Sequence, residues 1–140
     1  MKRFILAACL AAAPITAATA QEPEPAPAQA GGKIVMFRVG SIMGAGVGCP
    51  LRYKGQEVVE LGRNKFAEWA VPAGSYILTN KTASVEVNVM PGQTKYVRCT
   101  IKPGFMSGRA DLQVVDAETF SQHQDEYERK EVAAIAVAAN

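Results

Sequence analysis

Between residues 33 and 115, apolar and polar residues alternate in short runs that turn signals separate. The clearest run is SVEVNV at 84–89, in which every second residue is valine. A period of two places alternate side chains on one face of a β-strand, and a core buries that face. Long helical patterns, which would join parallel strands by crossovers, do not interrupt the runs. The pattern therefore predicts an all-β domain over 33–115, an antiparallel β-sandwich of about seven to eight strands.

Glycine and proline mark the ends of the predicted strands, because both residues favour turns over strand interiors. Examples are PAG at 72–74 and PG at 91–92. In the last run, every second residue from Ala110 to Val114 is expected on one face. We expect strands at 34–39, 49–54, 57–61, 65–71, 75–79, 84–89, 94–101 and 109–115.

Residues 1–20 have the three parts of a secretory signal peptide. Lys2 and Arg3 give a positive start, an apolar run follows, and the small residues ATA at 18–20 provide a cleavage site. The apolar run is too short to span a membrane. We therefore expect cleavage after residue 20 and a mature protein that is periplasmic or secreted.

The sequence LAAC at 6–9 also resembles a lipoprotein cleavage box, in which lipidation of Cys9 would anchor the protein to a membrane. Only five residues separate Arg3 from Cys9, whereas a signal needs about seven or more apolar residues. We expect export without an anchor, with lipidation at Cys9 as the alternative. The stretch 21–32, QEPEPAPAQAGG, has little to bury and is predicted to be a disordered linker.

Charge is distributed unevenly along the predicted mature chain. Without the signal peptide, 13 basic and 13 acidic residues remain, so the mature chain has no formal net charge. Residues 33–115 carry 11 Lys or Arg and 5 Asp or Glu, and residues 116–140 carry 2 and 6. This asymmetry is compatible with solvated surface charge, with a basic partner site, or with association of the two parts. The basic residues are scattered and are not clustered with aromatic residues, so we expect no nucleic-acid binding.

After the last strand the composition shifts to helix-forming residues, and 116–140 is predicted to be a C-terminal helix. Asp116 can cap its start, and Phe120 and Tyr127 fall close to one face at helical spacing. We interpret these two aromatic residues as a docking face. The final apolar run, VAAIAVAA at 132–139, is too short to span a bilayer, and it could pack on the sheet, touch a membrane surface or fray.

Two of the three cysteines, Cys49 and Cys99, remain after removal of the signal peptide. Each lies on the more apolar face of its predicted strand, and an exported compartment is oxidising. We predict a Cys49–Cys99 disulfide, with two unpaired buried thiols as the alternative. A bond that closes a loop of roughly 50 residues stabilises by about 4 kcal/mol in the chain-entropy model, which is much of the net stability of a small domain.

Residues suited to catalysis or metal binding are few. His123 is the only histidine, it lies outside the predicted β domain, and one histidine with two oxidised cysteines cannot form a typical zinc site. Glu57 and Glu60 are an odd number of positions apart, so we expect them on opposite faces of one strand. The glycine-rich stretch 44–48 lacks the spacing of a phosphate-binding loop. We therefore expect no enzyme activity, no metal and no cofactor.

Four segments match the turn and strand signals of one known family: IVMFR at 34–38, LRYKGQEVVEL at 51–61, VPAGSY at 71–76 and PGQTKYVR at 91–98. They resemble the bacterial family catalogued as domain of unknown function 2846, over about 33–115. The resemblance implies an exported or lipid-anchored envelope protein with a transthyretin-like or PEGA-like sandwich, and it implies nothing about activity. The chain departs from the family's general pattern in its cysteine pair and, relative to some members, in lacking a convincing lipid anchor.

Four apolar residues are expected in loops rather than in the core: Ile42 and Met43 in the glycine-rich loop, and Phe105 and Met106 before the last strand. Together they could form an exposed apolar rim, which is typical of a surface that binds a partner. The first functional hypothesis is therefore an exported non-enzymatic module that binds a protein, a peptide or another envelope component. The alternatives are a structural or assembly subunit that uses sheet edges or the C-terminal helix, and a small-molecule carrier with a site at the loop end.

Overall fold

The computed structural model describes residues 31–42, 44–106, 108–135 and 137. The predicted signal peptide and all but the last two residues of the predicted linker lie outside this part of the chain. The described chain is all β, as the alternation predicts, and its strands form two sheets. In chain order the elements are β1 Gly32–Arg38, β2 Cys49–Tyr53, β3 Gln56–Leu61, β4 Lys65–Val71, β5 Gly74–Thr79, β6 Ser84–Val89, β7 Thr94–Lys102, β8 Arg109–Val115, α1 Ala117–Ser121, the 3-10 turn η1 Gln124–Glu126, and β9 Glu128–Arg129.

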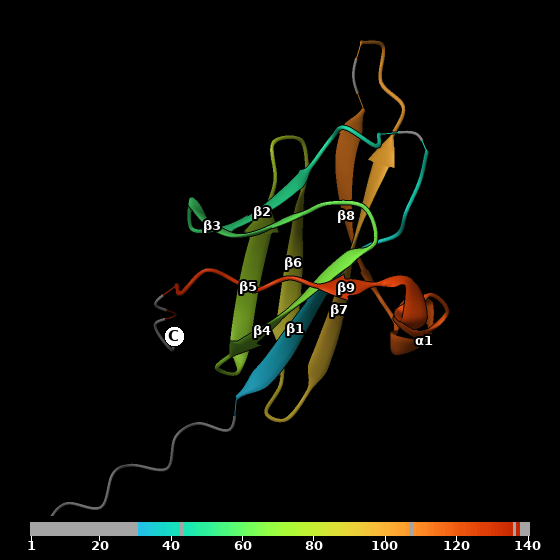
Figure 1. Ribbon diagram of the computed structural model, residues 1–140. Coiled ribbons are helices and arrows are strands. Elements are labelled where there is room, and N and C mark those ends of the chain that lie inside the picture. The colour runs from blue at the N-terminus through green and yellow to red at the C-terminus, as the bar shows by residue number, and fades with distance from the viewer. Residues whose placement is uncertain (1–30, 43, 107, 136, 138–140) are drawn as a thin grey trace, which may run out of the picture.

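The strands are ordered β8-β7-β1-β4-β9 in one sheet and β3-β2-β5-β6 in the other (Figure 1). We call these sheet A and sheet B. Their inward side chains form one buried cluster, to which every strand from β1 to β8 contributes. Within it, the rings of Tyr53, Trp69 and Tyr76 meet with centroids between 5.4 and 5.7 Å apart. The alternate residues of both sheets thus share a single core, which is the arrangement that a period of two favours.

Sheet A is mixed rather than antiparallel. β1 pairs antiparallel with β4 but parallel with β7, in a register that places Lys33 beside Thr94, and β9 pairs parallel with β4. The expectation of purely antiparallel strands is therefore wrong for sheet A, whereas the pairs in sheet B are antiparallel. The chain between β1 and β7 runs through sheet B and β4, so parallel neighbours arise without a helical crossover.

The C-terminal segment is not the helix predicted for 116–140. The helix α1 covers only Ala117–Ser121, although Asp116 caps it as expected by accepting a backbone hydrogen bond at 2.9 Å. The chain then turns through η1 and joins sheet A as β9. The rings of Phe120 and Tyr127 stack with centroids 5.2 Å apart, whereas seven residues of continuous helix would rise about 10.5 Å. Docking of both rings at one place therefore requires the helix to end between them.

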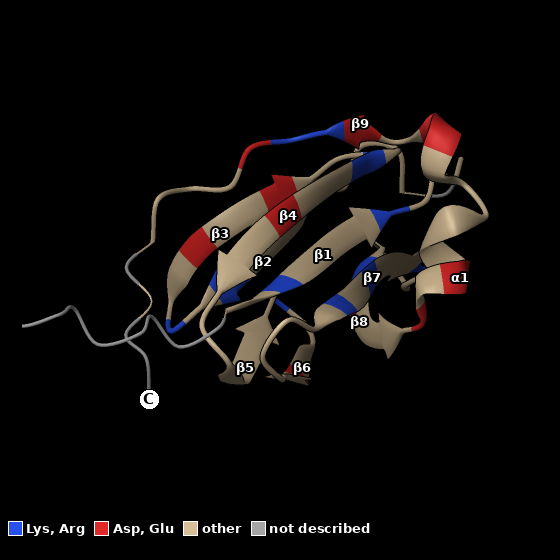
Figure 2. Ribbon diagram, turned by 90° about the horizontal axis from the view of Figure 1, so that it is seen from below, with Lys and Arg blue, Asp and Glu red and all other residues tan. Residues whose placement is uncertain are grey.

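Phe120 and Tyr127 dock on the outer face of sheet A, as the docking-face interpretation predicts. They form a second buried cluster with Val35 and Phe37 of β1, and the Phe37 ring centroid lies 5.2 Å from that of Phe120. Acidic residues mark the surface of α1 and η1 (Figure 2). The docked segment thus adds an acidic outer layer to sheet A.

The end of the chain also packs on the protein, so the β domain extends beyond its predicted boundary at residue 115. The Ala133 N–H donates a hydrogen bond to the Val58 carbonyl of β3 at 2.8 Å. Of the three alternatives for the run 132–139, the described part of the run therefore packs on the protein. Among the described residues, no helix has the length and apolar character needed to cross a membrane. Three apolar residues of this run lie against the main core: Val132, Ile135 and Val137.

Candidate functional site

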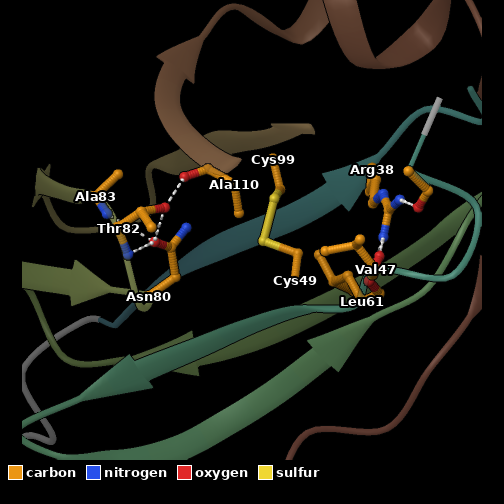
Figure 3. Close-up of a disulfide and its surroundings, with 10 residues drawn as sticks. Arg38, Val47, Cys49, Leu61, Asn80, Thr82, Ala83, Cys99 and Ala110 are labelled. Atoms are coloured by element: carbon orange, nitrogen blue, oxygen red, sulfur yellow. Dashed lines mark hydrogen bonds between the residues drawn. A yellow bond between two sulfur atoms is a disulfide. The ribbon is translucent and has the colours of Figure 1, made fainter. Parts of the chain in front are cut away.

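A disulfide joins the two sheets, as the cysteine positions predict. Cys49 at the start of β2 and Cys99 in β7 are bonded, with Cα atoms 6.7 Å apart. Both cysteines are buried in the main core, which agrees with the apolar faces of their strands. The bond lies between two networks of polar contacts (Figure 3). It therefore fixes the end of the molecule where the glycine-rich loop enters β2.

Arg38, the last residue of β1, belongs to the first of these networks. Its side chain is 2% exposed, and its guanidinium donates hydrogen bonds to the carbonyl oxygens of Gly44 at 2.7 Å, Leu61 at 3.3 Å and Val47 (Figure 3). Burial lowers the pKa of Arg38, and repulsion from Arg63 lowers it further. Backbone carbonyls rather than a carboxylate therefore satisfy this buried cation.

The glycine-rich loop is shaped by Arg38 and is not built to hold phosphate. The carbonyl oxygens of Gly44 and Val47 accept hydrogen bonds from the guanidinium, whereas a phosphate-binding loop directs several N–H groups at its ligand. The Val47 N–H is itself occupied, because it donates to the Gly44 carbonyl at 3.0 Å. This geometry agrees with the conclusion drawn from the glycine spacing.

The second network links the turn between β5 and β6 to sheet A. The Asn80 side-chain oxygen accepts hydrogen bonds from the N–H groups of Thr82 at 2.8 Å and Ala83 at 2.7 Å, which is a common way for asparagine to close a turn. The Thr82 hydroxyl then donates to the carbonyl of Ala110 in β8 (Figure 3). This contact ties the β5–β6 turn to the start of β8.

A groove of about 470 Å³ lies between the glycine-rich loop, this turn and the start of β8. Its volume falls within the range of small-ligand pockets. The charged residues Glu60, Lys81 and Arg109 line it, so both signs of charge are present. Histidine and cysteine, the usual base and nucleophile, are absent from the described lining. The other lining residues are Gly46, Val47, Gly48, Pro50, Thr82, Gly108 and Ala110.

The apolar rim predicted from the sequence is exposed where the structure describes it. Ile42 and Met106 are 91% and 92% exposed and Phe105 is fully exposed, whereas Met43 lies outside the described residues. Phe105 and Met106 occupy the β7–β8 hairpin tip, which projects beyond the two sheets (Figure 1). These two residues line a hollow of about 280 Å³ together with Gly44, and Ile42 is not part of that lining. The structure thus brings together two of the four predicted residues.

Glu57 and Glu60 share one face of β3, contrary to the expectation from their odd spacing. Along the ladder, β2 advances by one residue where β3 advances by two, so Val58 is the extra residue of a β-bulge. The bulge restores an even step between the two glutamates. Both side chains are exposed on the face opposite the core.

Several other titratable groups take part in surface ion pairs and in the helix cap. His123 lies between α1 and η1, with its Nδ1 atom 3.3 Å from Glu126 Oε1. Hydrogen bonds at the helix cap lower the pKa of Asp116, and a hydrogen bond from Lys65 lowers that of Glu128. Within the described ranges, no group of three or more His, Cys, Asp or Glu residues could hold a metal ion.

Comparison of the chain with protein-family models, with curated proteins and with solved structures found no match. The resemblance to the family of unknown function therefore stays a prediction, and the function has to be inferred from geometry. The geometry has two parts: an apolar hairpin tip, and a groove of mixed charge beside the disulfide-anchored loops.

Proposed function

We propose that this protein is an exported, non-enzymatic β-sandwich module of the bacterial cell envelope, and that it binds a protein partner through the β7–β8 hairpin tip. The exposure of Phe105 and Met106 at that tip carries the proposal. The single core shared by both sheets supports the sandwich architecture. The disulfide supports a periplasmic or secreted location, because such bonds persist in oxidising compartments. Membership of the family of unknown function that the sequence resembles is part of the same proposal.

The hairpin tip suits insertion into an apolar pocket of a partner. Burying a phenylalanine or methionine side chain contributes about 1.5–3 kcal/mol each. The hairpin is held below its tip by the Cys99 disulfide and by an ion pair between Lys102 Nζ and Asp111 Oδ2 at 2.6 Å. A tip on an anchored hairpin loses little conformational freedom on binding, so more of the burial energy contributes to affinity.

A small-molecule carrier is the second candidate, and the groove beside the loops favours it. Glu60 provides a negative charge there, and Lys81 and Arg109 provide positive charges. Such a site suits a small ligand that carries both signs of charge. It predicts that binding depends on the groove residues and not on the hairpin tip.

The test begins with a photo-reactive phenylalanine analogue at position 105, used to crosslink the protein to its partner in the envelope fraction. Binding of the isolated partner to Phe105→Ser/Met106→Ser is then compared with binding to the parent. We expect an affinity loss of at least about 100-fold, because the contacts of both apolar side chains are removed.

Met90→Ser is the matched control. Met90 is another exposed apolar residue, at 68%, but it lies in the β6–β7 turn at the opposite end of sheet A (Figure 1). It should change the affinity by less than about twofold. If the tip variant binds as well as the parent while Glu60→Gln/Lys81→Gln does not, the groove is the binding site and the tip proposal is wrong.

A further inference from the structure

β8 is an edge strand of sheet A, and the direction of its backbone groups follows from the register. The Lys33 N–H of β1 donates to the Gln93 carbonyl at 2.9 Å, and Lys33 lies beside Thr94 in the parallel pair. Hydrogen-bonding direction alternates along a strand. The odd-numbered residues of β7 therefore direct their backbone groups toward β1, and the even-numbered residues direct theirs toward β8.

In β8, the backbone groups of Ala110, Leu112 and Val114 point away from β7, toward the open edge of the sheet. The even-numbered residues of β7 pair with the odd-numbered residues of β8, so the even-numbered residues of β8 direct their N–H and C=O groups away from the sheet. The contact from Thr82 agrees with this direction, because its hydroxyl reaches the Ala110 carbonyl from outside sheet A. Among the described residues, no other hydrogen bond reaches these outward groups.

The other sheet edges carry a cover or a charge, as protected edges do. The C-terminal segment covers β3, where the Ala133 N–H donates to the Val58 carbonyl and Lys130 Nζ donates to the Glu60 carbonyl. β9 covers the edge of β4. β6 presents the exposed carboxylate of Glu86. Each of these devices hinders the addition of another strand.

No described strand pairs with the outer edge of β8, although β6 of sheet B lies beside it and β8 itself carries the charged residues Arg109 and Asp111. Its seven residues contain no proline and pair with β7 without a bulge. The residues whose backbone groups point to the open edge have apolar side chains that face the core. Among them, the Val114 side chain is still 43% exposed. An edge of this kind is a template for pairing with a further strand.

Charge indicates which strand fits. Arg109 begins β8, whereas Asp116 and Glu118 follow its end. Neither Arg109 nor Glu118 forms an ion pair within the described part of the chain. A second β8 laid antiparallel brings the Arg109 of each copy to the acidic end of the other, and a two-fold axis makes both contacts equivalent. A parallel arrangement would place Arg109 beside Arg109.

We propose that β8 pairs with β8 of a second copy of this chain, antiparallel and about a two-fold axis. The outward N–H and C=O groups of Leu112 and Val114 bond to outward groups of the partner's β8, so that sheet A becomes continuous across both copies. The pairing also covers Val114. This dimer goes beyond partner binding at the hairpin tip and does not depend on it.

The test is the mass of the oxidised protein in sedimentation experiments over a concentration series. Val114→Pro removes an outward N–H without removing a bond to β7, a position where an edge strand tolerates proline. We expect it to raise the dimer Kd at least about tenfold. Asn88→Pro is the matched control on β6, where the hydrogen bond from Asn80 N–H to the Ala83 carbonyl places Asn88 outward, and it should leave the Kd unchanged. Circular dichroism and melting curves establish that both variants fold.

A charge swap gives a second readout that loss of fold cannot imitate. Arg109→Glu alone should raise the Kd about three- to tenfold, because two symmetry-related pairs change from attraction to repulsion. Adding Glu118→Arg to that variant should restore the Kd to within about twofold of the parent. Arg63→Glu makes the same charge change at an exposed site outside β8 and should have no effect.

Three results would overturn the dimer. The first is a monomer at every concentration of the parent protein. The second is a dimer that a folded Val114→Pro variant and the charge reversal both leave intact. The third is dissociation by Asn88→Pro without dissociation by Val114→Pro, which would assign the contact to β6.

Discussion

Arg38 is a buried cation whose hydrogen-bond partners are backbone carbonyls. One guanidinium contacts carbonyl oxygens of Gly44, Val47 and Leu61, so a single side chain positions the second half of the glycine-rich loop and the end of β3. The sequence pattern did not identify this role. The available signal was an arginine directly after the four consecutive apolar residues 34–37, because an unbroken apolar run is typical of a strand that is covered on both faces.

We expect Arg38→Lys to lower the free energy of unfolding by about 1–2 kcal/mol, and Arg38→Met by about 2–3 kcal/mol. An ammonium group cannot match the fork of a guanidinium, and a thioether donates to none of the three carbonyls. Urea unfolding near neutral pH measures both changes. Limited proteolysis should show faster cleavage within 39–48.

Arg63→Lys is the control for Arg38, because Arg63 is exposed, and it should change stability by less than about 0.5 kcal/mol. A methionine variant as stable as the parent would mean that the loop carbonyls do not need the guanidinium.

The C-terminal segment is held by contacts rather than by its own helical stability. α1 has five residues, far fewer than an isolated helix needs in water. The Phe120 ring lies between 5.2 and 5.6 Å from the rings of four other aromatic residues, so this side chain is a main contact between the segment and sheet A, beside Tyr127 and β9. The four are Phe37, Phe66, Tyr96 and Tyr127.

Phe120→Ala should therefore release the segment and lower the free energy of unfolding by about 2–4 kcal/mol. Hydrogen exchange measured by mass spectrometry should show faster exchange in 117–129 than in the parent, with little change in β2 and β5. Phe120→Leu keeps most of the apolar volume and should keep most of the protection. Unchanged exchange in 117–129 after Phe120→Ala would show that Tyr127 and β9 suffice.

Local signals predicted the strands, and long-range contacts decided how they pair. Each of β1 to β8 lies within about two residues of its predicted bounds, because glycine and proline fix where strands end. The parallel neighbours Lys33 and Thr94 are far apart in sequence, and no local pattern encodes that contact. The bulge at Val58 and the short α1 are tertiary effects of the same kind. The exposed tip at Phe105 and Met106 was predictable, since turn signals flank apolar residues there.

At the scale of the whole molecule, the Cys49–Cys99 bond joins sheet A to sheet B. Its two cysteines were predictable because the period of two assigns each of them to an inward face. Apolar packing across the shared core also holds the sheets together, and hydrogen bonds from Arg38 to the Leu61 carbonyl and from Thr82 to the Ala110 carbonyl cross between them. In the unfolded chain the bond therefore restricts how far the segments around Cys49 and Cys99 can separate.

The variant Cys49→Ala/Cys99→Ala should unfold with a free energy about 2–4 kcal/mol lower than the parent, since the bond closes a separation of 50 residues. Urea titration measures the loss, and the parent kept in reductant should match the variant. A thiol assay on the denatured, unreduced exported protein should find no free thiol. Two free thiols, or equal stability of variant and parent, would contradict this expectation.

The position of β1 in the middle of sheet A also governs the order in which the chain can fold. β1 is the first strand of the domain, yet its parallel neighbour β7 follows it only after five other strands. Pairings between such distant segments close slowly, which places folding among the slower all-β domains. Until β7 forms, one edge of the apolar stretch IVMF at 34–37 stays unpaired and can associate with other chains. The first strand of the domain is thus fully paired only after six further strands have formed, and under the export that we propose this interval falls after the chain has crossed the membrane.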